Sequence, residues 1–254
     1  MANSISWKKI FDDLNIMDHN FDKAPFIITA TQIKKACQDF KETSEKEPRI
    51  LCKQDTREQR PKVFTDNGLF ILPIKNGTYS IIRGEGYLDL PEIVNDSIIY
   101  DPKIEFTLDT SKIGNSEMQH LDYAYAISII RTFIEDNTLV LTIRGRKYTP
   151  KFEFNVGKHH IITQGVQTEV DAGYEGVDKV VLIEAKNNKA TNTIIRQLYY
   201  PYRQWQEHTK KKVMTCFFER ESNNQFHLWL FEFTEKNNYN SIKLVDSKKY
   251  KVIW

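Results

Sequence analysis

A short stretch of the sequence holds two carboxylates and a lysine at spacings that suit metal-assisted hydrolysis. Asp171 is followed, after a glycine-containing turn at 173–176, by the apolar run 180–183 and then by Glu184-Ala185-Lys186. We expect two strands of a hairpin, in which alternate side chains share a face, so that Glu184 and Lys186 lie together. The apolar run is typical of a strand covered on both faces, where an ion pair is costly unless it has further partners. A divalent cation held by Asp171 and Glu184 would be such a partner.

The chemistry expected of this triplet is phosphodiester hydrolysis. Mg²⁺ prefers carboxylate, carbonyl and water oxygens, so Asp171, Glu184 and the carbonyl of Ala185 are the expected ligands. The ion would lower the pKa of a bound water and offset charge at phosphorus. Lys186 would orient that water and stabilise the transition state. A lone E-x-K triplet on a strand is usually a solvated ion pair of little energetic value; the apolar run, the paired aspartate and the helix that follows favour a catalytic site.

Two other acids near the triplet have alternative interpretations. Glu169 shares the expected face of Asp171, where it either joins the site, as a ligand or by orienting the attacking water, or forms a salt bridge at the sheet edge. Asp178 lies six residues before Glu184 and competes with Asp171. It falls at the turn end of the hairpin, too far along the strand from Glu184 to share a metal ion. Asp171 is therefore the favoured ligand.

The elements that must position these residues alternate in type. Helical spacing predicts one helix over 116–135 and another over 193–207, which Pro201 should kink. Strands are expected at 139–143, 151–156, 160–171, 179–185, 213–218 and 226–233. This order predicts an α/β (α+β) fold with a mixed sheet and helices on its faces.

The first 115 residues predict a smaller α+β module. A helix is expected over 4–16 and a second one from Thr29 or Thr31, either of which can cap it. Strands are expected at 62–65, 69–74 and 78–83, with Asn76-Gly77 as a turn. Two helices followed by a hairpin suit a winged-helix-like module, which could take part in reading DNA. We place the boundary near Asn115, which gives domains 1–115 and 116–254.

Composition excludes several classes of protein. The chain has 254 residues, 40% of them hydrophobic, which is enough for a sizeable core. Three widely spaced cysteines form neither a disulfide framework nor a zinc-ligand pair. No segment approaches the ~18 apolar residues of a membrane span, and the N-terminus lacks the apolar region of a secretory signal. We therefore expect a cytoplasmic protein without a membrane partner.

Positive charge is concentrated in the segment that follows the E-x-K triplet in the sequence. Residues 1–115 hold 16 Lys and Arg against 18 Asp and Glu, whereas the remainder holds 20 against 16. Between Lys186 and Lys212 there are seven basic residues and one acid, Glu207. Such a surface can contact phosphates, although a solvated helix with core aromatics has the same pattern. The candidate DNA contacts are Lys189, Arg196 and Arg203 from this segment, with Arg144, Arg146 and Lys147 from an expected turn.

The triplet also carries a family resemblance. Asp171 followed by Glu184-Ala185-Lys186 resembles the PD-(D/E)XK nuclease motif in its E-x-K form, with Val170 where the motif has proline. The segment 195–203 resembles a stretch of type II restriction endonuclease-like proteins. The resemblance covers roughly residues 116–233. It implies a restriction endonuclease-like core, with Asp171 and Glu184 as metal ligands and Lys186 as the catalytic lysine. It also implies, more loosely, a polar contact to the site from Gln197 on the following helix.

The function implied by the resemblance is that of a Mg²⁺-dependent, site-specific deoxyribonuclease. Such an enzyme cuts double-stranded DNA and typically acts as a homodimer, because two-fold DNA sites match two-fold protein symmetry. Two alternatives stay open. One is a non-catalytic DNA-binding or partner-binding module that keeps the nuclease fold. The other is a structure-specific repair nuclease or a nuclease that acts on RNA.

Overall fold

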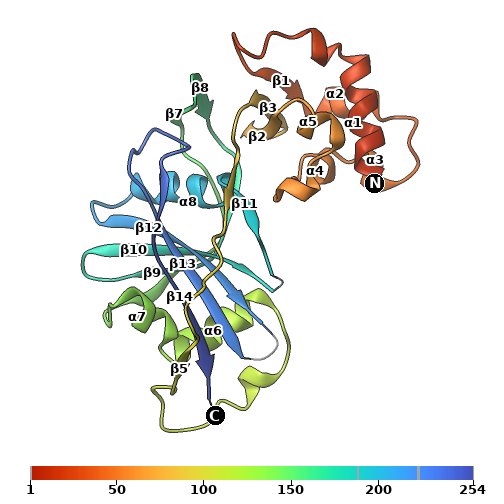
Figure 1. The fold of residues 1–254 in the computed structure, drawn as a ribbon. Coiled ribbons are helices and arrows are strands. Elements are labelled where there is room, and N and C mark those ends of the chain that lie inside the picture. The colour runs from red at the N-terminus through yellow and green to blue at the C-terminus, as the bar shows by residue number, and fades with distance from the viewer. Residues whose placement is uncertain (1, 188, 222–223, 254) are drawn as a thin grey trace.

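The computed structural model describes residues 2–187, 189–221 and 224–253 (Figure 1). The α-helices are α1 (Ala2–Asp13), α2 (Ala30–Ala36), α3 (Thr43–Lys46), α4 (Pro48–Leu51), α5 (Lys62–Thr65), α6 (Glu117–Ala126), α7 (Ile129–Ile134) and α8 (Arg196–Gln206). The strands are β1 (Phe26–Thr29), β2 (Leu69–Lys75), β3 (Thr78–Arg83), β4 (Tyr87–Asp89), β5 (Ile98–Tyr100), β6 (Val140–Tyr148), β7 (Phe152–Val156), β8 (His159–Thr163), β9 (Gln167–Glu175), β10 (Lys179–Lys186), β11 (Asn192–Ile194), β12 (Lys212–Arg220), β13 (Gln225–Phe233) and β14 (Ile242–Val252). Among the described helices, none is both long enough and apolar enough to cross a membrane.

A seven-stranded mixed sheet forms the larger part of the molecule. Its strand order is β5-β14-β13-β12-β10-β9-β6. Two pairs of neighbouring strands are parallel: β10 with β12, which α8 connects, and β14 with β5. The other neighbours are antiparallel. The expected mixed sheet of an α+β fold is therefore confirmed.

Helices cover the sheet on both faces, as expected. Leu198 and Tyr199 of α8 pack with Leu182 on one face. Ala124 of α6 packs with Ile183 on the other. Successive residues of β10 thus enter opposite cores, which is why the run 180–183 is apolar without alternation.

The N-terminal module has a three-stranded sheet of order β1-β3-β2 and a core of its own. The buried residues of this core lie between Trp7 and Ile81, and the Trp7 and Phe64 rings meet edge to face at 4.7 Å. Thr29 caps α2 through a capping box, so the first of the two expected caps is used. Strand β3 has the expected bounds. The strand expected at 62–65 is wrong: helix α5 occupies it, because Pro61 starts the turn and Phe64 points into the core.

A strap formed by residues 84–97 connects the module to the far end of the large sheet (Figure 1). In this strap, β4 pairs with β11, and Trp229 donates from Nε1 to the carbonyl of Pro91 at 2.8 Å. Strand β5, directly after the strap, then pairs with β14 at the sheet edge. These residues precede the expected boundary near Asn115, yet their strand partners belong to the second part of the chain.

Four expected elements have different bounds or a different type in the structure. The helix expected over 116–135 breaks into α6 and α7 at Ser128, which has φ 69°. The strand expected over 160–171 is two strands, β8 and β9, separated at Gly165 with φ 65°. The basic turn expected at 144–147 lies inside β6, where Gly145 adopts φ 79° and lets the edge strand bend. Helix α8 starts later than expected because β11 occupies the first residues of that segment, and the helix continues through Pro201.

Candidate active site

A cleft of about 730 Å³ lies where the N-terminal module meets the large sheet. Its wall includes Asp171 of β9, Glu184 and Lys186 of β10, and Gln197 of α8. The module lines it through the loop 53–59, which precedes α5. The structure therefore brings these four expected site residues together, with Glu169 also at the cleft, and adds a second wall from the other part of the chain.

Asp171 owes its position to the separation of β9 from β10. Pairing between the two strands runs to Ile183 opposite Ala172, after which β9 follows β6 instead. Between the pairs Ile143–Gly173 and Gly145–Val170, β9 has one residue more than β6, which makes a β-bulge at Asp171. The bulge turns the carboxylate toward β10, where the main-chain N–H of Ala185 donates to Asp171 Oδ2 at 2.8 Å.

Glu184 is held from the α8 side of the sheet. Its carboxylate is 12% exposed and accepts a hydrogen bond from Gln197 Nε2 at 2.9 Å. Thr193 Oγ1 donates to Gln197 Oε1 at 2.8 Å, which fixes the orientation of that amide. Lys186 forms an ion pair with the same oxygen of Glu184. The contact from Gln197, which sequence similarity suggested only loosely, is thus present in this structure.

Burial leaves both carboxylates short of compensating charge. It raises the pKa of Glu184 to about 7, although the neighbouring ammonium of Lys186 opposes the shift. It also raises the pKa of Asp171, against the opposing hydrogen bond from Ala185. Burial alone would lower the pKa of Lys186, but pairing with Glu184, together with the charges of Glu117 and Asp171, outweighs burial, and the net pKa is raised. Lys186 is therefore an ammonium at neutral pH.

The donor set fits a hard divalent cation. Two partly desolvated carboxylates lie beside Ala185, whose carbonyl points to the same strand edge as the N–H that contacts Asp171. Within the described ranges there is no group of three or more His, Cys, Asp and Glu side chains placed to hold a metal ion. The expected ligand set contains two acids and one main-chain oxygen and does not require such a group.

Glu169 and Asp178 differ in their relation to the cleft. Glu169 lines the cleft. It also pairs with Arg146 Nε at 3.1 Å, which is the salt bridge at the sheet edge that one of the two interpretations predicted. Its side chain is 52% exposed. Asp178 lies in the turn after β9, is 76% exposed and pairs with Lys179 at 3.8 Å, away from the residues that line the cleft.

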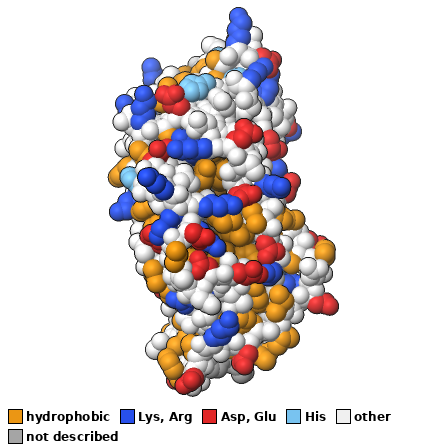
Figure 2. Space-filling model, turned by 90° about the vertical axis from the view of Figure 1, so that its left-hand side faces the viewer, with side chains coloured by type: hydrophobic (Ala, Val, Ile, Leu, Met, Phe, Trp, Pro, Cys, Tyr) orange, Lys and Arg blue, Asp and Glu red, His pale blue; other side chains and the backbone are white. Residues whose placement is uncertain are grey.

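The expected DNA contacts separate into three groups. Lys189 and Arg196 line the cleft. Arg144 pairs with Asp122, whereas Arg146 and Lys147 are exposed on β6. The expectation for Arg203 is wrong: its side chain is 4% exposed, and its guanidinium lies over the Phe152 ring and donates to the carbonyl of Glu153 at 2.8 Å. On the face that Figure 2 shows, basic and acidic side chains are interspersed.

Three acids that line the cleft were missed from the sequence: Glu117, Asp55 and Glu58. Glu117, the first residue of α6, faces the site, and its charge is among the causes that raise the pKa of Asp171. Its place was detectable, because Ser116 and Gln119 form a capping box that marks the start of the helix. Asp55 comes from the module loop, and its place depends on tertiary packing that no local pattern reports.

Comparisons with known proteins divide the chain just after the module core. A family model described as Domain of unknown function (DUF6996) matches residues 4–81, and one described as Domain of unknown function (DUF6997) matches residues 82–251. No curated protein and no solved structure matches the chain. The second model covers the strap, the large sheet and every expected catalytic residue. The chain therefore belongs to the family described as Domain of unknown function (DUF6997).

Proposed function

We propose that this protein is a Mg²⁺-dependent nuclease that hydrolyses phosphodiester bonds of double-stranded DNA. The observation that carries the proposal is the convergence of Asp171, Glu184 and Lys186 in one cleft, at the point where β9 and β10 separate. The resemblance to PD-(D/E)XK nucleases rests on these same residues. It implies a mixed sheet with flanking helices, and at that level the observed architecture agrees.

The metal-binding role falls to the two carboxylates. Asp171, Glu184 and the carbonyl of Ala185 would hold the cation, and bound Mg²⁺ would supply a water of lowered pKa and positive charge close to phosphorus. The chain itself prepares the site by keeping Asp171 fixed through Ala185 and Glu184 fixed through Gln197. Burial of both carboxylates favours ligation by a cation over hydration.

Lys186 would act as a hydrogen-bond donor and a positive charge, because its raised pKa keeps it protonated. An ammonium cannot accept the proton of the attacking water, so general-base catalysis is not assigned to it. It would instead orient the water or stabilise a non-bridging phosphate oxygen as negative charge develops there. Gln197 and Thr193 do not contact the substrate in this proposal; they position Glu184.

Sequence-specific cutting of the restriction type is the finer form of the proposal. The module places a loop directly in the cleft, so a part of the chain outside the large sheet would contact DNA close to the scissile bond. Lys189 and Arg196 would neutralise backbone phosphates there. This arrangement gives the N-terminal module a role in selecting where the duplex is cut.

The test is cleavage of supercoiled plasmid with Mg²⁺ and with EDTA. We expect metal-dependent nicking or linearisation, and we expect Glu184→Gln and Lys186→Ala to lower the rate at least ~100-fold while duplex binding persists. Lys179→Ala is the matched control, since Lys179 lies on the same strand and pairs with Asp136 and Asp178 outside the catalytic triplet. It should cut like the parent chain.

The alternatives give different band patterns. Cleavage that is undiminished in EDTA, or in either active-site variant, would contradict the assignment. Duplex binding with no cutting of any nucleic acid would indicate a non-catalytic module. Preference for branched, single-stranded or RNA substrates over plasmid would indicate a structure-specific or RNA nuclease.

A further inference from the structure

The cleft contains an ion pair that joins the two parts of the chain. Arg196, the first residue of α8, donates from Nη2 to Asp55 Oδ1 at 3.2 Å. Asp55 belongs to the module loop, and both residues line the cleft that holds Asp171 and Glu184. Their side chains are 22% and 14% exposed, so the pair lies at the cleft wall and not in a sealed core.

The loop holds Asp55 in place through its main chain. The N–H of Asp55 donates to Gln59 Oε1 at 2.8 Å, and its carbonyl accepts from the N–H of Ile194 at 2.8 Å. The carboxylate is therefore free to face cations. Lys53 Nζ approaches its second oxygen at 3.7 Å, and the Lys53 side chain is 70% exposed.

We infer that Arg196 and Lys53 form a binding site for a backbone phosphate of DNA, and that Asp55 occupies this site until the phosphodiester displaces it. A carboxylate and a phosphodiester each present two oxygens that share one negative charge, and guanidinium groups bind both in the same way. The inference rests on the proposed function in taking DNA as the ligand. It adds a site shared by both parts of the chain and a carboxylate that competes with the substrate.

Contrasting arginines support this assignment. Arg203 is buried, and its guanidinium donates hydrogen bonds to the carbonyl of Glu153 and to the hydroxyl of Tyr199 inside the protein. Arg57 pairs with Asp89 and Glu85, outside the residues that line the cleft. Arg196 combines a position in the cleft with a single acidic partner among the described residues.

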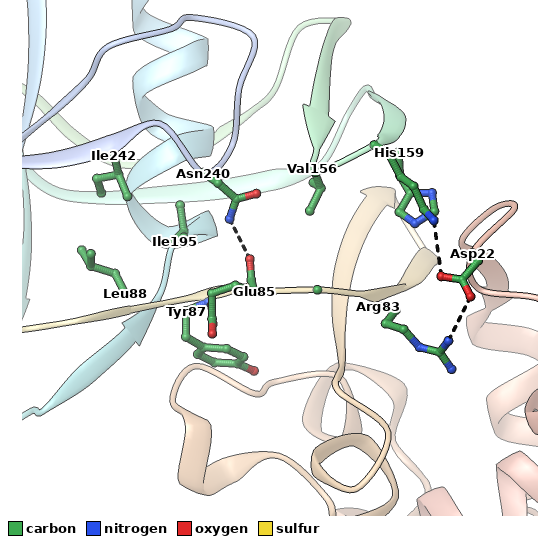
Figure 3. A pocket seen from close by; sticks show the side chains of 13 residues that line it. Asp22, Arg83, Glu85, Tyr87, Leu88, Val156, His159, Ile195, Asn240 and Ile242 are labelled. Atoms are coloured by element: carbon green, nitrogen blue, oxygen red, sulfur yellow. Dashed lines mark hydrogen bonds and ion pairs between the residues drawn. The ribbon is translucent and has the colours of Figure 1, made fainter.

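Two other acids at the junction provide matched controls. Glu58 lies in the same loop and cleft, but its carboxylate accepts from a neutral amide, Asn192 Nδ2, at 2.9 Å. Asp22 resembles Asp55 more closely, because it pairs with Arg83 of the module at 3.6 Å and, across the same junction, with Lys158 at 3.3 Å. It does so in a second cavity of about 420 Å³ that shares no lining residue with the cleft (Figure 3).

The experiment measures binding of the full chain to a fluorescently labelled DNA duplex in EDTA, so that cleavage plays no part. We expect Asp55→Asn to tighten binding ~3–10-fold at low salt and to steepen the salt dependence by about one phosphate contact, because two cations lose their internal partner. Glu58→Gln and Asp22→Asn remove the same charge and should change the affinity less. Arg196→Gln and Lys53→Gln should weaken binding.

A double variant makes the inference specific. In the Arg196→Gln background, the increase in DNA affinity caused by Asp55→Asn should shrink to the increase caused by Glu58→Gln. Lys53→Gln serves as a second background, since this exposed residue can be changed without disturbing the fold. Equal gains from all three acid variants, or a gain from Asp55→Asn that persists in both backgrounds, would overturn the inference while leaving the nuclease proposal intact. If no variant and no parent protein binds duplex DNA, both proposals fall.

Discussion

At the scale of single residues, Glu184 is a buried carboxylate that must be ionised to bind the proposed cation. Its pKa is raised to about 7 from a usual value of 4.5, chiefly by burial. Between pH 4.5 and about pH 7, Glu184 therefore stays protonated in the folded chain but is ionised in the unfolded chain. The contribution of Glu184 to stability is therefore greatest at low pH and is lost as pH rises through about 7.

This linkage predicts a difference between the parent and Glu184→Gln in the absence of metal. The parent should lose about 2 kcal/mol of unfolding free energy relative to the variant between pH 5 and pH 8, since one pKa unit is worth about 1.4 kcal/mol. Urea unfolding in EDTA at the two pH values measures this difference. Parallel pH profiles for parent and variant would contradict the raised pKa.

A second residue-scale prediction concerns the cation. Ligation needs ionised carboxylates, so the rise in melting temperature caused by Mg²⁺ should be larger at pH 8 than at pH 6. Asp171→Asn should abolish it. Glu219→Gln is the control, because Glu219 is another buried acid with a pKa raised to about 7, but it lies on β12 and accepts from the N–H of Ala190. A Mg²⁺ effect that is independent of pH, or that survives Asp171→Asn, would argue against this site.

At the scale of elements, the bulged β9 decides where Asp171 points. Gly173 lies two residues beyond the bulge, and a Cβ there would meet Ile143 Cβ at 2.6 Å and Leu182 Cδ2 at 3.1 Å. We expect Gly173→Ala to destabilise the fold by about 1–3 kcal/mol through overpacking between β6 and β10. Urea unfolding measures the loss. An unchanged midpoint would mean that β6 can move away from β9 without cost.

The same elements show what local sequence could and could not predict. The apolar run of β10 and its terminal E-x-K triplet were sufficient to predict a doubly covered strand and the approach of Asp171. The bulge was not predictable, because it arises from the register of β9 against β6, which depends on pairing distant in sequence. The break at Ser128 was missed because apolar spacing continues through it, while its left-handed conformation has no signal in a serine.

At the scale of the whole molecule, the module and the large sheet act as one unit at the cleft. Asn192 of β11 accepts from the N–H of Arg57 at 2.7 Å and donates to Glu58 at 2.9 Å. Asn192 itself is buried, so Asn192→Ala should cost about 1–3 kcal/mol by removing both hydrogen bonds and leaving the half-buried N–H of Arg57 without its acceptor. It should also loosen the module and make the main chain around Glu85 more mobile, which speeds cutting by a glutamate-specific protease at this residue, whose side chain is already exposed. Asn67→Ala, which removes a contact to Val63 within the module, is the control and should not speed this cut.

The pairing of β5 with β14 has a consequence for how the molecule is made. Ile98 lies opposite Tyr250, so this edge strand has no strand partner until the last part of the sheet has been synthesised. The module core, by contrast, is complete once Ile81 has emerged from the ribosome. Nascent chains should therefore carry a folded module while the strap beyond it is still free, and such long-range closure is a slow step of folding. The cleft, whose walls come from both parts of the chain, would then form only after the module has folded.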